Sequence, residues 1–300
     1  MPKWVLRPIV CMLLLLFGTP AYATEILLLG ANEKLLQSYS QSLGKLSAPD
    51  RTISVSTSLN TKVEHADLCI VLGSELLKRA ISLRGTRPTV SLLTSKPDFQ
   101  AVLNDLPKIA TNATAIYAEP DPHLQAKLIR SIYTWDDHTA VILSAKTREK
   151  EQELLSAFQN TGVKPVFYFY DGKRSLRALL HDIKEDNINS IFAIPDETLF
   201  NRETVREIII TAYKNRQAII GFSPSLVKAG AIATVYTTKE QIISQINDLI
   251  ETYSLTKKLP QPSYSKYIDI YRNNDVARSM NVAIPEQQKL IRLVQGGIDE

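Results

Sequence analysis

The stretch "ADLCIVLGSELLKRAISL", residues 66–83, contains the unit from which most of the chain is built. Its apolar run, residues 68–72, is typical of a short strand that is buried on both faces. A turn follows, and the apolar residues after the turn have the spacing of a helix that packs one side on a sheet. This order of strand, turn and helix indicates a parallel sheet covered by helices on both faces.

The same unit recurs in two sets. The strands of the first set read "EILLLG", "RTISVSTS", "ADLCIVLG", "PTVSLLT" and "ATAIYAE", and those of the second read "TAVILS", "KPVFYFY", "SIFAIP" and "QAIIGFS". We therefore predict an α/β fold with two doubly wound, Rossmann-like lobes, residues 24–135 and 136–258. The connector between them is expected near residues 133–138.

Each set ends in a helical pattern that we expect to cover the sheet of its own lobe. The first is "PHLQAKLIRSIY", residues 122–133, and the second is "KEQIISQINDLIETYSL", residues 239–255. The tail, residues 259–300, does not continue the cycle, because it has an extended segment at Pro260 and Pro262, one alternating strand-like run and one short helical run. We expect this tail to return across the hinge, which would make a clamshell with a ligand crevice between its lobes.

The amino terminus has the pattern of a secretory signal peptide. Lys3 and Arg7 precede an apolar run that is too short to cross a bilayer, and small residues at Ala21 and Ala23 suit cleavage after Ala23. Removal of residues 1–23 lowers the formal net charge from +4 to +2 and leaves Cys69 as the single cysteine. We therefore expect an exported, periplasmic chain without an internal disulfide.

The chain carries no motif for the common kinds of catalysis or cofactor binding. It has no G-x-G-x-x-G, no phosphate-binding P-loop, no G-x-S-x-G elbow and no H-E-x-x-H, and its four histidines are not spaced as metal ligands. The near-balanced charge, without a basic stripe, argues against a nucleic-acid partner. We expect no enzyme activity, no metal and no cofactor.

Two conspicuous stretches are given structural interpretations. The acidic run "DDH", residues 136–138, is expected to be a solvated hinge rather than a cation site. The aromatic run "VFYFY", residues 166–170, is expected to pack in the core, with Phe167 and Phe169 on one face of a buried strand and Tyr168 and Tyr170 on the other.

Polar residues and one phenylalanine follow the apolar strands, and they form the candidate ligand site. The carboxyl ends of parallel strands meet at one edge of a sheet, so these residues should converge on the crevice. The alternative is that they only cap helices, which Ser, Thr, Asn and Asp also do for structural reasons. The candidates are Asn32, Gly73, Ser74, Thr94, Ser95, Lys146, Asp171, Asp196, Phe222 and Ser223.

The stretch "IFAIPDETLFN", residues 191–201, places two adjacent carboxylates at such a strand end. We interpret them as an exposed polar lip of the crevice, with Asp196 reaching a ligand and Glu197 facing water. Pro195 ends the strand, since it cannot donate to the ladder. Asn201 is the expected cap of the next helix, with Glu203 in its first turn.

Several stretches together resemble the periplasmic substrate-binding proteins of ABC transporters, in the branch that includes binders of tryptophan and related amino acids. The likeness lies in "IFAIPDETLFN", "IVLGS", "RPTVSLLTSKP", "VKAGA" and "VARSMNV", and it extends over the whole mature chain. The resemblance implies a type I clamshell that closes on a small solute and delivers it to an inner-membrane permease. Lys96 departs from it, because relatives often have Asp there.

The function that follows is solute binding by a monomeric periplasmic component of an ABC transport system, with a small polar or amino-acid-like ligand. The alternative is a ligand-free interaction protein on the same fold, associated with an outer-membrane receptor or an envelope complex. A hydrolase that uses Asp196 or Glu197 is a third possibility, but the sequence shows no nucleophile or water-activating partner for it.

Overall fold

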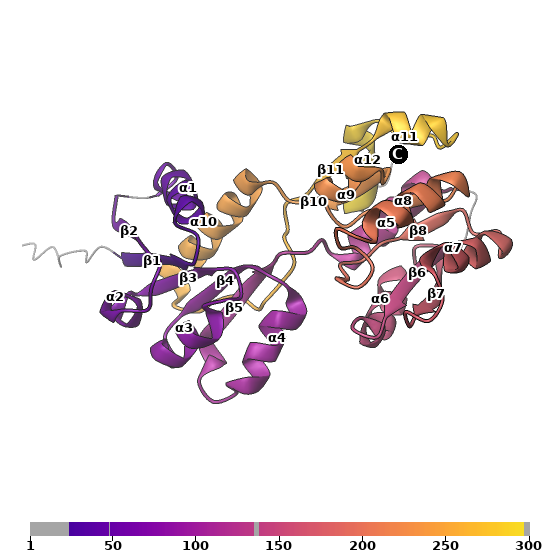
Figure 1. Ribbon diagram of the computed structural model, residues 1–300. Coiled ribbons are helices and arrows are strands. Elements are labelled where there is room, and N and C mark those ends of the chain that lie inside the picture. The colour runs from indigo at the N-terminus through magenta and orange to yellow at the C-terminus, as the bar shows by residue number, and fades with distance from the viewer. Residues whose placement is uncertain (1–23, 48, 135–137, 297–300) are drawn as a thin grey trace, which may run out of the picture.

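The structure is a computed structural model, and it describes residues 24–47, 49–134 and 138–296. The predicted signal peptide, residues 1–23, and most of the predicted acidic hinge, residues 135–137, lie outside the described residues. The described chain forms two α/β lobes, each built around one sheet (Figure 1). None of its helices is long and apolar enough to cross a membrane.

The first lobe contains a parallel sheet of five strands in the order β2-β1-β3-β4-β5. All five residues of β3 are buried, as expected for a strand that is covered on both faces. The strands are β1 Thr24–Gly30, β2 Arg51–Ser56, β3 Leu68–Leu72, β4 Thr89–Thr94 and β5 Ala113–Tyr117. This strand order is a doubly wound one, so the predicted fold of this lobe is confirmed.

Helices cover both faces of the first sheet. One face packs against α1 and α10, and the other packs against α2, α3 and α4. These elements are α1 Glu33–Gly44, α2 Thr61–His65, α3 Leu77–Arg84, α4 Lys96–Asp105, the 3-10 turn η1 Ala110–Asn112, and α10 Lys239–Thr256.

The second lobe contains a sheet of six strands in the order β11-β10-β9-β8-β6-β7. Five of them are parallel, and β11 from the tail pairs antiparallel with β10. The strands are β6 His138–Ser144, β7 Lys164–Tyr170, β8 Ser190–Phe192, β9 Ala218–Ile220, β10 Ala233–Tyr236 and β11 Asp269–Arg272. The prediction missed β10, whose four residues are too few to show a pattern.

Helices also cover both faces of the second sheet. One face packs against α5, α6, α11 and α12, and the other packs against α7, α8 and α9. These elements are α5 Pro122–Ile132, η2 Arg148–Lys150, α6 Glu151–Phe158, α7 Leu176–Glu185, α8 Val205–Lys214, α9 Pro224–Ala229, α11 Asn274–Ser279 and α12 Gln287–Gln295. Residues 269–295 of the tail are therefore part of this lobe.

The two lobes exchange a helix, contrary to expectation. Helix α5 follows the last strand of the first sheet, yet its buried Ile129 and Ile132 pack in the core of the second sheet. Helix α10 follows the second set of strands, yet its buried Ile246 and Leu249 pack in the core of the first sheet. The sequence grouped each helix with the strands that precede it, and both groupings are wrong.

Because of this exchange, the hinge segments lie at other residues than predicted. The chain first crosses between the lobes at residues 118–121, between β5 and α5, and not at the predicted connector near residues 133–138. It crosses back at residues 237–238, between β10 and α10. After α10, Ser263 bridges to Ile116 of the first lobe, and residues 264–268 then lead into β11 of the second. Three segments therefore join the lobes (Figure 1).

The aromatic run lies in β7, which is an edge strand and not a buried one. Phe167 packs on one core cluster, and Tyr168 and Tyr170 pack on the other, so the expected alternation is confirmed for these three residues. Phe169 is exposed at the open edge, and the Arg148 guanidinium lies 4.2 Å from its ring centroid.

Candidate functional site

The candidate residues of the first lobe follow three neighbouring strands, β1, β3 and β4. Two of them cap helices. The Asn32 side chain accepts a hydrogen bond from the Leu35 amide at 3.0 Å, and the Ser95 hydroxyl accepts one from the Asp98 amide at 3.2 Å. Ser74 is exposed and does not cap α3, which has no side-chain cap. Among these three residues, Ser74 has the hydroxyl most available to a ligand.

Gly73 gives the loop after β3 its shape. It is half-buried and has a φ of +90°, in the left-handed region that other residues enter at a cost of roughly 1–2 kcal/mol. Its amide donates to the Leu92 carbonyl at 2.8 Å, which fixes this loop to the neighbouring strand. A Cβ at this position would meet nothing within 4 Å, so conformation and not space requires the glycine.

Strand β4 is irregular at the end that points to the candidate site. Leu93 has a φ of +56°, and the register between β4 and β5 shifts there. Thr94 is buried, and its hydroxyl accepts a hydrogen bond from Ser91 at 2.8 Å. Thr94 is therefore inside the lobe rather than at the crevice, and the next side chains, Ser95 and Lys96, are half-buried at the surface. β-Bulges of this kind often re-aim side chains beside binding sites.

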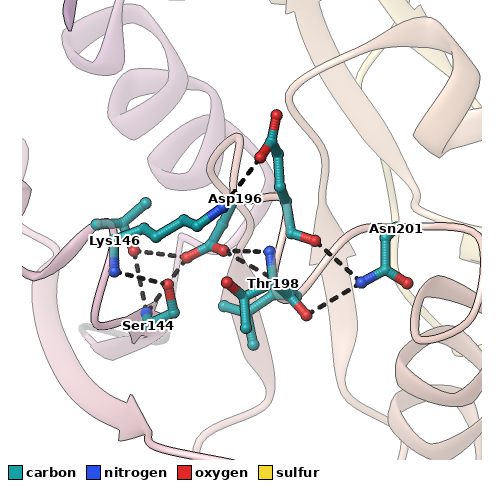
Figure 2. A network of polar contacts seen from close by, with 8 residues as sticks. Ser144, Lys146, Asp196, Thr198 and Asn201 are labelled. Carbon is teal, nitrogen blue, oxygen red and sulfur yellow. Dashed lines mark hydrogen bonds and ion pairs between the residues drawn. The ribbon is translucent and has the colours of Figure 1, made fainter.

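Asp196 is buried, which contradicts the expected exposed lip. Figure 2 shows its carboxylate between the loops that follow β6 and β8. One oxygen accepts from the Thr147 hydroxyl at 2.6 Å and from the Ser144 amide at 3.2 Å, and the other accepts from the Thr198 amide at 2.8 Å. The short Asp side chain thus connects two loops whose positions in the chain are about fifty residues apart, a contact that no local pattern reveals.

These hydrogen bonds also determine the charge of Asp196. Burial alone would raise its pKa, but the bonds from Thr147 and Ser144 outweigh burial and hold the pKa below its ordinary value. The Leu199 amide also donates to this carboxylate, at 3.3 Å. An ionised carboxylate with four bonds of this kind is a poor proton donor and a poor proton acceptor at neutral pH. This arrangement suits a structural role, and it weakens the hydrolase reading.

Glu197 differs from its neighbour. Its side chain is 88% exposed and pairs with Lys146 at 3.1 Å, so its predicted position facing water is confirmed. The Asn201 side chain accepts from the Glu203 amide at 2.9 Å and from the Thr204 amide at 3.0 Å, while Val205 donates to the Asn201 carbonyl. Asn201 therefore caps the turn that precedes α8, and not the helix itself: α8 begins at Val205 after Thr204, so the predicted helix cap at Asn201 and the predicted first-turn position of Glu203 are wrong.

Phe222 and Ser223 line a hollow at the carboxyl end of β9. The hollow has a volume of about 500 Å³ and lies between the loops after β8 and β9. Phe200 and Phe222 meet edge to face, with ring centroids 5.4 Å apart. The Ser223 hydroxyl caps α9 by accepting from the Leu226 amide at 3.2 Å. The full lining is Phe200, Asn201, Arg202, Val205, Phe222, Ser223, Ser225, Leu226 and Ala229.

Six residues of this lining were not among the predicted residues: Phe200, Arg202, Val205, Ser225, Leu226 and Ala229. Phe200 was within reach, because it follows the same strand end as Asp196 in the quoted stretch. Asp171 lies apart from the hollow, since β7 is three strands from β9, or about 14 Å at the usual spacing of strands. The structure thus brings together Phe222 and Ser223 and separates them from Asp171.

The described ranges contain no group of three or more His, Cys, Asp or Glu side chains that could hold a metal ion. Cys69 is buried, and burial raises the pKa of its thiol to about 11, so it is not a reactive thiolate at neutral pH.

Comparisons with known proteins bear on the fold. No protein-family model matches the chain, and no curated protein matches it in sequence. Among solved structures, a ligand-free, open substrate-binding protein with adhesive properties from Clostridium difficile matches with a TM-score of 0.68 and 13% identity, over 88% of this chain and 97% of that one. The fold of this chain is therefore similar to that of a substrate-binding protein.

Two further structures match over 90% of this chain and 97% of their own. One is a conserved domain protein from Vibrio cholerae, with a TM-score of 0.56 and 17% identity. The other is an ABC domain in complex with L-Trp from Streptococcus pneumoniae, with a TM-score of 0.52 and 13% identity. At these identities the likeness establishes the fold, and the predicted two-lobed α/β clamshell is confirmed.

Proposed function

We propose that the protein is the periplasmic solute-binding component of an ABC transport system. The observation that carries this proposal is the hollow around Phe222, which lies at the carboxyl ends of parallel strands in a clamshell with three hinge segments. Crevices at this edge of doubly wound sheets are where such folds bind small molecules. Its partners would be a small-molecule ligand and an inner-membrane permease.

The lining of the hollow suggests how a solute would bind. Phe200 and Phe222 offer apolar surface, while the exposed Arg202 and Ser225 offer polar groups at the rim. Binding would favour a closed state of the clamshell, with the backbone change absorbed at residues 118–121, 237–238 and 264–268. No bond of the ligand is made or broken in this process.

The second candidate is an interaction protein that keeps the clamshell but binds no solute. A specific observation favours it: Thr94 and Asp196 are buried, and Asn32, Ser95 and Ser223 serve as helix caps. Half of the candidate ligand residues are therefore already engaged within the protein. Such a protein would dock on a receptor or an envelope complex through its surface.

A ligand screen by thermal shift, followed by calorimetry, distinguishes a solute-binding protein from an interaction protein that binds no solute. A solute that binds only the folded protein stabilises it by about 2.7 kcal/mol when present at 100 times its Kd, so a true ligand should raise Tm clearly. We expect at least one amino acid or similar small metabolite to do so. Failure of every solute in a broad screen would favour the interaction protein.

A substitution locates the binding site once a ligand is found. Phe222→Ala removes half of the aromatic pair, and we expect about tenfold weaker binding, which corresponds to about 1.4 kcal/mol. Phe169→Ala is the matched control, since it removes an exposed phenylalanine of the same lobe at the far edge strand. If Phe222→Ala and Phe169→Ala bind the ligand with equal affinity, the ligand binds outside the hollow.

A further inference from the structure

The lobes are in direct contact through one charged cluster beside the hinge. Lys96, in the first turn of α4, donates to the Glu153 carboxylate of α6 at 2.5 Å. The same carboxylate oxygen accepts from the Tyr264 hydroxyl at 3.1 Å. Lys96 belongs to the first lobe, Glu153 to the second, and Tyr264 to the third hinge segment. One carboxylate therefore connects three parts of the clamshell: the first lobe, the second lobe and a hinge segment.

On the first-lobe side, the cluster is packed against aromatic rings and bonded to a hinge carboxylate. The Tyr264 ring meets Tyr117, at the end of β5, edge to face with centroids 5.1 Å apart. Tyr117 in turn meets Phe99 of α4, with centroids 6.2 Å apart, and Phe99 is fully buried. The Lys96 amide donates to the Glu119 carboxylate at 2.8 Å, and Glu119 lies in the first hinge segment.

The Lys96–Glu153 pair is also less exposed than Lys78–Asp105, an ion pair within the first lobe. Its side chains are 27% and 37% exposed, compared with 55% and 56% for Lys78–Asp105. Water screens a partly buried pair less than an exposed one, so its attraction is stronger. Burial would raise the pKa of Glu153, yet the bonds from Lys96 and Tyr264 hold it below its ordinary value, so the carboxylate is ionised at neutral pH.

We propose that Lys96, Glu153 and Tyr264 form an interlobe latch that sets the angle between the lobes. Rotation of one lobe about the hinge must lengthen or re-aim the Lys96–Glu153 bond, because its two ends lie on different lobes. The latch therefore narrows the range of lobe angles that the free protein visits. It does not depend on the identity of a ligand, or on whether the protein binds one.

Distances between spin labels on the two lobes test the latch. Ser82 of α3 and Ser156 of α6 are exposed, and each can be replaced by a labelled cysteine, while the buried Cys69 remains unlabelled. In the ligand-free protein we expect Lys96→Gln and Glu153→Gln each to broaden the distance distribution and shift its mean. Tyr264→Phe should cause a smaller shift in the same direction.

Three controls assign the effect to the ion pair. The double substitution Lys96→Glu with Glu153→Lys should restore the original distribution. Lys78→Gln, which breaks a pair within the first lobe, should leave it unchanged. Salt at about 1 M, where the Debye length is about 3 Å, should move the unsubstituted protein toward the Glu153→Gln distribution. Unchanged distances in both single variants, or no recovery in the double one, would overturn the latch.

Discussion

The two lobes are built by the same strand–helix unit, but they form their crevice edges in different ways. The first lobe ends its strands in short polar loops shaped by Gly73 and by the irregular β4, with small side chains such as Ser74 at the surface. The second lobe ends its strands in a buried carboxylate network at Asp196 and an aromatic hollow at Phe222. The strand ends of the two lobes therefore differ: backbone conformation shapes the loops of the first lobe, and a carboxylate network with an aromatic hollow forms those of the second.

The exchanged helices provide the test with the largest expected effect on stability. Ile246 of α10 and Ile129 of α5 are both fully buried, and each packs in the lobe opposite to its place in the sequence. We expect Ile246→Ala and Ile129→Ala each to reduce the free energy of unfolding by about 3 kcal/mol, which is usual for a large buried residue.

Hydrogen exchange measured peptide by peptide shows which lobe is weakened. Ile246→Ala should increase exchange in β1 and β3, and Ile129→Ala should increase it in β6 and β8. The reverse pattern would mean that each helix stabilises the lobe in which the sequence analysis placed it.

A second test concerns the buried carboxylate. Asp196→Asn removes the charge that receives hydrogen bonds from Thr147 and Ser144, and we expect a loss of about 2 kcal/mol in the free energy of unfolding at pH 7. Because the folded pKa is depressed, this stability is present above the ordinary pKa and is lost as pH falls through the folded value.

Urea denaturation at pH 7 and pH 3 measures both effects. The difference between Asp196→Asn and the unsubstituted protein should shrink at the lower pH. Glu197→Gln is the control in the same loop, and with a side chain 88% exposed it should change stability little at either pH. A large effect of Glu197→Gln would contradict the assignment of the structural role to Asp196.

The smallest effect is expected at the hinge, at Glu119. One of its carboxylate oxygens is buried without a partner, and burial raises the pKa of the group despite the bond from the Lys96 amide. A raised folded pKa means that stability is fully present below the unfolded pKa and is lost as pH rises through the folded value.

Glu119→Gln should remove this dependence. The stability of the variant relative to the unsubstituted protein should therefore be greater at pH 7 than at pH 4, as measured by urea denaturation at the two values. If the difference in stability between the variant and the unsubstituted protein is the same at both pH values, Glu119 titrates as an ordinary exposed carboxylate.

The sequence predicted the fold class because the apolar strands and the helices between them are local patterns. It could not predict which sheet α5 and α10 cover, since an amphipathic stripe such as that of Ile246 and Leu249 fits either sheet. It identified the strand ends correctly as places for polar residues, and it recognised that some would be caps. The burial of Asp196 could not be read from the chain, because its partners Ser144 and Thr147 are distant in sequence.

The exchanged helix has a consequence for the order in which the protein can form. Lys239, at the start of α10, bonds to Ser38 of α1, and these residues are 201 positions apart. A chain made from its amino terminus therefore holds all five strands of the first sheet, and α1, long before the second helix of that face exists. That face of the first lobe is covered by α1 alone until α10 has been synthesised, so completion of the first lobe depends on residues that follow most of the second.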